Sequence, residues 1–213
     1  YIFCGRVGSF GNGRADVWLI KTDAKGQKDW EKNYGWGSTD FGYEVKETND
    51  GGYIIIGVTD AYGRADVWLI KTDFQGNEEW NRIFGENDIE YGFSVQQTTD
   101  GGYIVSGETK SFGNGHLDFW LIKTDYQGHE EWNKTFNGDG NSNDHGYSVQ
   151  QTSDEGFIIV GQADLGPNNG YEQVWLIRTN SMGEEVWNKT FGGDGTDRGY
   201  SVQQTTDGGY VII

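Results

Sequence analysis

A repeated pair of tryptophans constrains the fold of this chain more than any other feature. The first member of each pair lies in a segment of the type Asp-Val-Trp-Leu-Ile-Lys-Thr-Asp, and successive first members are 50, 52 and 55 residues apart. The second member follows twelve residues later in every copy. The pairs are Trp18 and Trp30, Trp68 and Trp80, Trp120 and Trp132, and Trp175 and Trp187. A period of this length without helical patterning indicates a repeat protein built from sheets.

Each repeat contains four candidate strands. In one copy they are residues 43–48, residues 53–57, the tryptophan segment and a final Trp-Asn-Lys-Thr-Phe type of segment. An Asp-Gly-Gly turn joins the first two strands and an Asp-x-x-Gly turn joins the last two, since both supply tight-turn backbone angles. The third strand is apolar at consecutive positions, as at Val67, Trp68 and Leu69. Because neighbouring strand residues face opposite sides, both faces of this sheet must be buried.

Sheets packed face to face around an axis bury both faces, so the sequence predicts an all-β fold, a β-propeller of four-stranded antiparallel blades. We expect repeat units at about 1–34, 35–84, 85–136 and 137–191, with a partial unit at 192–213. The chain begins and ends in a strand of the second type. That strand therefore occurs five times and each of the others four times, so we expect a single propeller domain or fragment that belongs to a larger ring.

The chain is strongly acidic. Its 213 residues carry a formal net charge of −17, with a pI near 4.4. A surplus of carboxylates disfavours nucleic-acid binding. The sequence contains no apolar run long enough to span a bilayer, so we expect no membrane insertion within this segment. The single cysteine, Cys4, excludes an internal disulfide and a Cys/His zinc site. We expect an extracellular or cell-surface location.

Two sets of loops share one face of the predicted propeller and vary in length and content. They join the second strand to the third and the fourth strand to the next repeat. Ligand-binding residues commonly lie in such loops, and flat rings with polar edges suit sugars and protein side chains. Candidate ligand-binding residues are Trp36, Phe10, Tyr62, Phe112 and Tyr171. Phe10, Tyr62 and Phe112 recur, so we interpret them as fillers between blades, whereas Trp36 is unique and is the best single candidate.

Acidic residues close the loops between repeats at Asp40, Glu90, Asp144 and Asp197. They could hold a cation at the channel mouth, but we expect each to accept backbone N–H bonds and fix its own loop. The polar loop 137–144 resembles a calcium loop, because oxygen-bearing side chains alternate with glycine. Its candidate metal ligands are Asp139, Asn141, Asn143 and Asp144. The loop lacks the sixth-position Gly and the twelfth-position Glu of an EF-hand loop, so we interpret it as a flexible polar loop and expect no cofactor, with Ca²⁺ as the alternative.

Recognised catalytic motifs do not occur in the sequence. The histidines His116, His129 and His145 lie in separate loops or turns, and no nucleophile elbow, metal-ligand spacing or phosphate-binding loop is found. We therefore predict that the chain is not an enzyme.

Basic residues recur at one point of the third strand, where we expect their aliphatic stems to pack along a blade and their charged groups to form ion pairs with carboxylates. They are Lys21, Lys71, Lys123 and Arg178.

Segment 69–80, Leu-Ile-Lys-Thr-Asp-Phe-Gln-Gly-Asn-Glu-Glu-Trp, resembles the repeat of pyrroloquinoline-quinone-type propellers. With Asp-Gly-Gly-Tyr-Ile and Trp-Asn-Lys-Thr-Phe-Gly, it also resembles repeats of secreted or surface-anchored propellers of archaea and bacteria. The resemblance implies the fold and carries over no catalytic residue. We favour a non-enzymatic extracellular binding or adhesion module for a glycan or protein ligand. The alternatives are a purely structural cell-surface or filament component, and a fragment of a quinone-dependent propeller enzyme.

Overall fold

The computed structural model describes residues 1–8, 14–36, 39–113, 116–138, 143–164 and 171–213, and these contain seventeen β-strands and no helix. The strands are β1 (Ile2–Val7), β2 (Asp16–Thr22), β3 (Lys28–Tyr34), β4 (Asp40–Glu47), β5 (Tyr53–Thr59), β6 (Asp66–Thr72), β7 (Glu78–Phe84), β8 (Glu90–Gln97), β9 (Tyr103–Thr109), β10 (Asp118–Thr124), β11 (Glu130–Phe136), β12 (His145–Gln151), β13 (Phe157–Asp164), β14 (Glu172–Thr179), β15 (Glu185–Phe191), β16 (Val202–Gln204) and β17 (Tyr210–Ile212).

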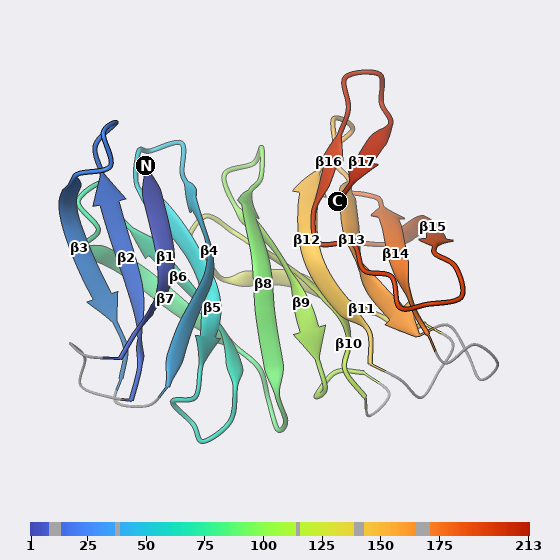
Figure 1. Ribbon diagram of the computed structural model, residues 1–213, viewed down its shortest axis with the longest axis horizontal. Helices are drawn as coiled ribbons and strands as arrows, with labels where there is room; N and C mark the ends of the chain where they lie inside the picture. The colour runs from blue at the N-terminus through green and yellow to red at the C-terminus, as the bar shows by residue number, and fades with distance from the viewer. Residues whose placement is uncertain (9–13, 37–38, 114–115, 139–142, 165–170) are drawn as a thin grey trace.

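The strands form five antiparallel sheets that follow one another in chain order (Figure 1). Three sheets have four strands each, β4–β7, β8–β11 and β12–β15, while β1–β3 and β16–β17 form smaller sheets at the two ends. Every strand pairs with its neighbour in sequence, so each sheet is a meander. The predicted all-β class and the four antiparallel strands per repeat are confirmed.

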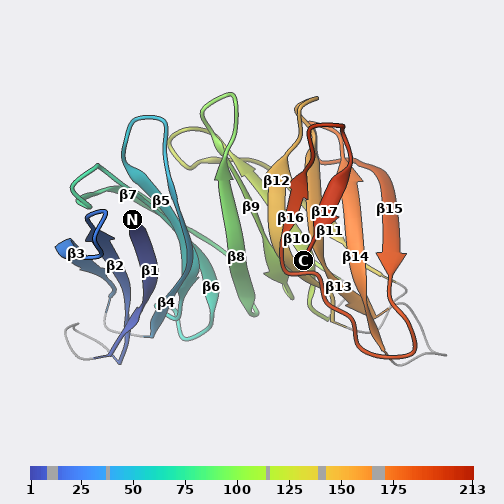
Figure 2. The ribbon, with the colours of Figure 1, turned by 45° about the horizontal axis from the view of Figure 1, so that its top comes forward.

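The sheets stand side by side, as two views of the molecule show (Figures 1 and 2). The first strands of successive sheets, β4, β8, β12 and β16, lie next to one another, and we call them the inner strands. We call the contact between two neighbouring sheets a seam. None of the described residues forms a helix that is long and apolar enough to cross a bilayer.

The hydrophobic core lies in the seams. Strands β5, β6, β9 and β10 are buried at every position, and for β6 and β10, the third strands of their repeats, the consecutive apolar residues predict this burial. In one seam Ile54 and Leu69 of one sheet pack in a single cluster with Trp120 and Ile122 of the next. Trp80 packs against the same cluster, so the second tryptophan of one repeat and the first tryptophan of the next help to fill the same seam.

The recurring basic residues also behave largely as predicted. Lys71 is buried, yet its Nζ lies 2.8 Å from Asp50 Oδ2 and 2.9 Å from Glu79 Oε2. Equivalent ion pairs join Lys123 to Asp100 and Glu131, and Arg178 to Asp154. The prediction is wrong only for Lys21, whose Nζ donates to the Tyr53 hydroxyl at 2.9 Å.

Candidate functional site: a groove along the inner strands

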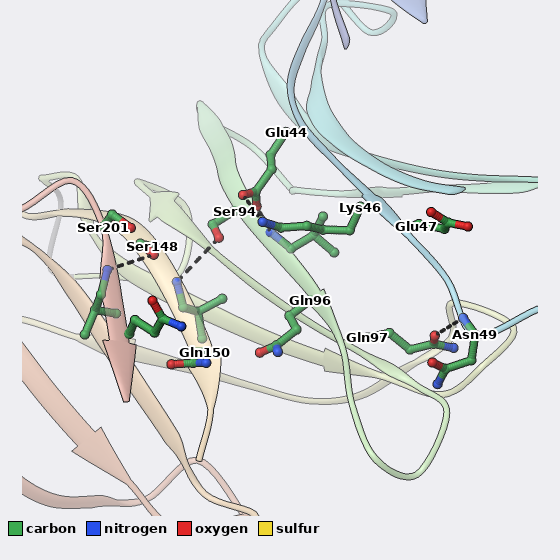
Figure 3. Close-up of a pocket in the computed structure, with 14 residues that line it drawn as sticks. Glu44, Lys46, Glu47, Asn49, Ser94, Gln96, Gln97, Ser148, Gln150 and Ser201 are labelled. Carbon is green, nitrogen blue, oxygen red and sulfur yellow. Dashed lines mark hydrogen bonds and ion pairs between the residues drawn. The ribbon is translucent and has the colours of Figure 1, made fainter. Parts of the chain in front are cut away.

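A groove with a volume of about 440 Å³ runs along the inner strands (Figure 3). Its lining comes from equivalent positions of the four strands and is mostly polar. A repeated Ser-Val-Gln segment contributes its serine and glutamine side chains from β8, from β12 and from residues 201–203 at the start of β16, whereas β4 contributes Glu44, Lys46 and Glu47. Lys46 Nζ lies 2.9 Å from Glu44 Oε1. The groove is therefore charged on the β4 side and uncharged along the remaining strands.

Side chains, not a backbone ladder, connect one inner strand to the next. The backbone N–H of Val95 donates to Glu44 Oε2 at 2.8 Å, and that of Val149 donates to Ser94 Oγ at 3.4 Å. Further along the groove, the Gln151 N–H donates to Gln96 Oε1 at 2.7 Å, and the equivalent bond joins Gln204 N to Gln150 Oε1 at 2.6 Å.

The amide nitrogens of two groove glutamines remain free to donate. Gln96 and Gln150 both turn their side-chain oxygens to a neighbouring backbone N–H. Because a carboxamide carries its acceptor and its donors on opposite arms, each Nε2 group points elsewhere, and neither reaches an acceptor within the part of the chain that the structure describes. The groove thus offers donors to a ligand.

A row of four aromatic rings lies next in sequence to the residues that line the groove, although no ring of the row is itself a lining residue. We call Tyr43, Phe93, Tyr147 and Tyr200 the aromatic row. Their ring centroids are separated by 5.4 Å, 5.5 Å and 5.2 Å in chain order. Each ring immediately precedes the first groove-lining position of its segment. The two end rings are the most open, with Tyr43 45% and Tyr200 57% exposed.

A β-bulge places each of the first three rings. The pairing register shifts between Gly42 and Glu44, between Gly92 and Ser94, and between Gly146 and Ser148. The bulged residue between them is the aromatic one, and a bulge re-aims the side chain that it inserts. The strand can come this close because the partner strand carries glycine at Gly57, Gly107 and Gly161, where a Cβ would overlap the inner strand's backbone.

Further rings and charges flank the aromatic row. Tyr91 stacks on Phe93 with centroids 6.2 Å apart, and His145 stacks on Tyr147 at 5.9 Å. His145 Nδ1 also contacts the Glu108 carboxylate. Burial and the nearby charge of Glu108 raise the pKa of Tyr147 to about 12, so this phenol stays neutral and can donate a hydrogen bond at physiological pH.

Of the loop aromatics predicted as ligand contacts, the described ones are not among the residues that line this groove. Phe112 stacks on Trp120 with centroids 5.1 Å apart, which confirms it as a filler. Tyr62 is 65% exposed, so its interpretation as a filler is wrong. Trp36 is half exposed and packs 5.3 Å from Trp68, while Tyr171 is exposed. The remaining candidate, Phe10, lies outside the described residues.

The acidic loop residues do fix their own loops, as predicted. Asp40 Oδ2 accepts the Trp36 N–H at 3.4 Å, and Glu90 Oε2 accepts the Glu86 N–H at 3.3 Å. The same bond joins Gly138 N to Asp144 at 2.8 Å and Gly193 N to Asp197 at 2.9 Å.

The calcium-like loop is described only in part. Asp139 and Asn141 lie outside the described residues. Asn143 Oδ1 accepts the Leu117 N–H at 3.2 Å, and Asp144 is buried. Within the described ranges, no three His, Cys, Asp or Glu side chains are grouped to hold a metal ion.

Comparison with known proteins places the fold but no family. No family model matches the chain, and no curated protein matches it. A similar solved structure is the β-1,2-mannobiose phosphorylase of Listeria innocua in complex with β-1,2-mannobiose, with 15% identity and a TM-score of 0.54 over 91% of this chain. Another is Sqt1 of Chaetomium thermophilum, with 13% identity and a TM-score of 0.52 over 88% of this chain.

These likenesses concern the fold alone. The chain spans 62% of the phosphorylase and 44% of Sqt1. Our prediction that the chain is not an enzyme is nevertheless wrong as it stands, because one structure with this fold is an enzyme. A lack of recognised motifs could not exclude catalysis on such a fold. Neither structure is named as a quinone enzyme or a secreted protein, so those implications of the sequence resemblance stay predictions.

Proposed function

We propose that the chain is part of a β-propeller, with each sheet a blade, and that it binds a neutral oligosaccharide along the groove of the inner strands. Four observations together support the propeller arrangement: the repeats of similar length, the meander of each sheet, the sheets buried on both faces, and the inner strands that lie next to one another.

The observation that carries the ligand class is the aromatic row on residues adjacent to those that line a polar groove. A sugar ring has an apolar C–H face that stacks on aromatic rings and hydroxyl groups that bond to amides and carboxylates. The row supplies the flat surface, and Gln96, Gln150 and Glu44 supply donors and acceptors beside it. The groove volume of about 440 Å³ lies in the usual range of small-ligand sites.

Charge favours a neutral sugar over an acidic one. The chain carries −17 overall, and the groove holds Lys46 between Glu44 and Glu47. A polyanionic glycan would be repelled by this field. A related fold solved with a neutral disaccharide, β-1,2-mannobiose, adds support for this ligand class.

The test is a panel of neutral oligosaccharides, followed by calorimetry with the best one. We expect Phe93→Ala and Tyr147→Ala to weaken binding by about tenfold, since stacking on one ring contributes about 0.5–1.5 kcal/mol beyond the apolar area that it buries. Tyr62→Ala, an exposed ring away from the groove, is the matched control and should bind as the parent chain does. Binding lost with Trp36→Ala but kept with Phe93→Ala would move the site to the loops and reject this proposal.

A further inference from the structure

Two buried carboxylates meet at the first seam, where β2 and β4 begin. The Asp40 N–H donates to the Ala15 carbonyl at 2.9 Å, which brings the ends of the two strands together. Asp16 is 4% exposed and Asp40 is fully buried. Burial, with Asp16 adding to it, raises the pKa of Asp40, as expected for like charges that share one site.

Both carboxylates face one small space beside Gly35. A Cβ on Gly35 would overlap Asp16 Oδ1 and would lie 2.9 Å from Asp40 Oδ2. Gly35 is not among the glycines with a positive φ. The backbone therefore does not demand glycine here, whereas the two converging oxygens do.

One of these two oxygens has no hydrogen-bond partner in the part of the chain that the structure describes. Asp16 Oδ1 is buried and receives no hydrogen bond from any described residue, although buried carboxylate oxygens normally accept at least one. The loop-fixing role of Asp40 accounts for its bond from Trp36 but gives no account of Asp16.

Two of the equivalent seams have a polar contact that the first seam lacks. At the second seam Arg64 Nε lies 3.4 Å from Asp66 Oδ1, whereas its counterpart Arg14 is exposed and makes no ion pair with the described residues. At the fourth seam Gln173 replaces the aspartate, and its amide donates to the carbonyls of Gly193 and Gly195. The first seam has two carboxylates, but among the described residues it has neither an arginine ion pair nor a glutamine in place of the aspartate.

We propose that the first seam binds a divalent cation, with Ca²⁺ as the preferred ion, between Asp16 and Asp40 beside Gly35. An all-oxygen donor set with two carboxylates suits a hard cation, and water completes the six to eight ligands that Ca²⁺ takes. A bound ion supplies the positive charge that Arg64 supplies at the second seam and gives Asp16 Oδ1 its missing partner.

Calorimetric titration of the chelator-treated chain with CaCl₂, in about 0.15 M salt to screen weak surface binding, tests this site. We expect saturable binding with Kd of about 10⁻³ M or tighter, the range of extracellular calcium modules, and a higher Tm with Ca²⁺. Asp16→Asn and Gly35→Ala should weaken binding by tenfold or more. Asp29→Asn removes the same charge from an exposed position on β3 and should leave binding unchanged.

Terbium luminescence locates the ion even if a seam variant fails to fold. The Trp36 backbone bonds to Asp40, so its indole should sensitise Tb³⁺ bound there, and Trp36→Phe should remove most of the emission while Ca²⁺ affinity is kept. The proposal is overturned if the parent chain shows no saturable Ca²⁺ or Tb³⁺ binding, which would leave a shared proton between the carboxyls. Binding that survives both Asp16→Asn and Gly35→Ala would also overturn it.

Discussion

The carbonyl oxygen of Tyr91 lies so close to Gly107 that a Cβ on this glycine would overlap it. Gly107 belongs to β9, and Tyr91 belongs to the inner strand β8, two residues before the ring of Phe93. This contact lets the bulge of β8 form, and the bulge positions a ring of the aromatic row.

Gly107→Ala should therefore destabilise the chain and disturb the groove. Forcing a methyl group against backbone in a packed region costs about 1–3 kcal/mol, and the displaced Phe93 should weaken oligosaccharide binding. Gly5 occupies the same repeat position in β1, where nothing lies within 4 Å of a Cβ. Gly5→Ala should change stability by about 0.5 kcal/mol or less. Urea unfolding measures both variants, and equal effects would contradict this role of the bulge.

The sequence predicted what depends on local pattern. Consecutive apolar residues such as Val67 and Trp68, and turn glycines such as Gly51 and Gly76 with their positive φ angles, specify buried strands and tight turns wherever they occur. The repeat therefore yielded the strands and their order. Spacing alone could not show which side chains meet across a seam.

The aromatic row escaped sequence analysis because it depends on contacts between sheets. A signal was present, since glycine precedes an aromatic residue in every inner-strand segment, as at Gly92 and Phe93. Without the bulge, that ring could equally have pointed into a seam. Loop aromatics such as Tyr62 drew attention instead, although loop position says little about what a ring touches.

Phe112 and Tyr62 provide a second prediction, because they come from corresponding loops but differ in burial. Phe112 is partly buried against the core cluster that contains Trp120, whereas Tyr62 is 65% exposed. Phe112→Ala should lower the free energy of unfolding by about 2–3 kcal/mol, slightly less than for a fully buried ring. Tyr62→Ala should change it by about 0.5 kcal/mol or less. Equal losses in urea unfolding would show that Phe112 does not cover the seam.

Lowering the pH should reduce the free energy of unfolding, because it protonates the carboxylates that form ion pairs with the buried basic residues. Partial burial alone would raise the pKa of Asp50, but bonds from Lys71, Thr48 and Gly52 outweigh it and lower the pKa to about 2. This value lies below the unfolded one, near 3.9. The ionised carboxylate therefore stabilises the fold above about pH 4, and this contribution is lost as the pH falls toward 2.

Asp50→Asn isolates that contribution. In urea unfolding at pH 7, 4, 3 and 2, the stability difference between the parent chain and Asp50→Asn should shrink as the pH falls. The exposed Asp29 provides the matched variant, Asp29→Asn, for which we expect no comparable trend. A difference for Asp50→Asn that stays constant down to pH 2 would mean that the carboxylate does not titrate in this range.

Gln96 and Gln203 occupy the same repeat position on different inner strands, but only Gln96 forms a hydrogen bond to the backbone of a neighbouring inner strand. Gln96 Oε1 accepts the Gln151 N–H at 2.7 Å in a partly buried setting. Gln203 lies on β16 and accepts no hydrogen bond from the described residues. Gln96→Ala leaves a backbone donor without its partner, which should cost about 1–2 kcal/mol, whereas Gln203→Ala should be nearly neutral. If urea unfolding gave equal values, side-chain bonds between inner strands would not help to hold the sheets together, and the groove would owe its shape to the apolar seams alone.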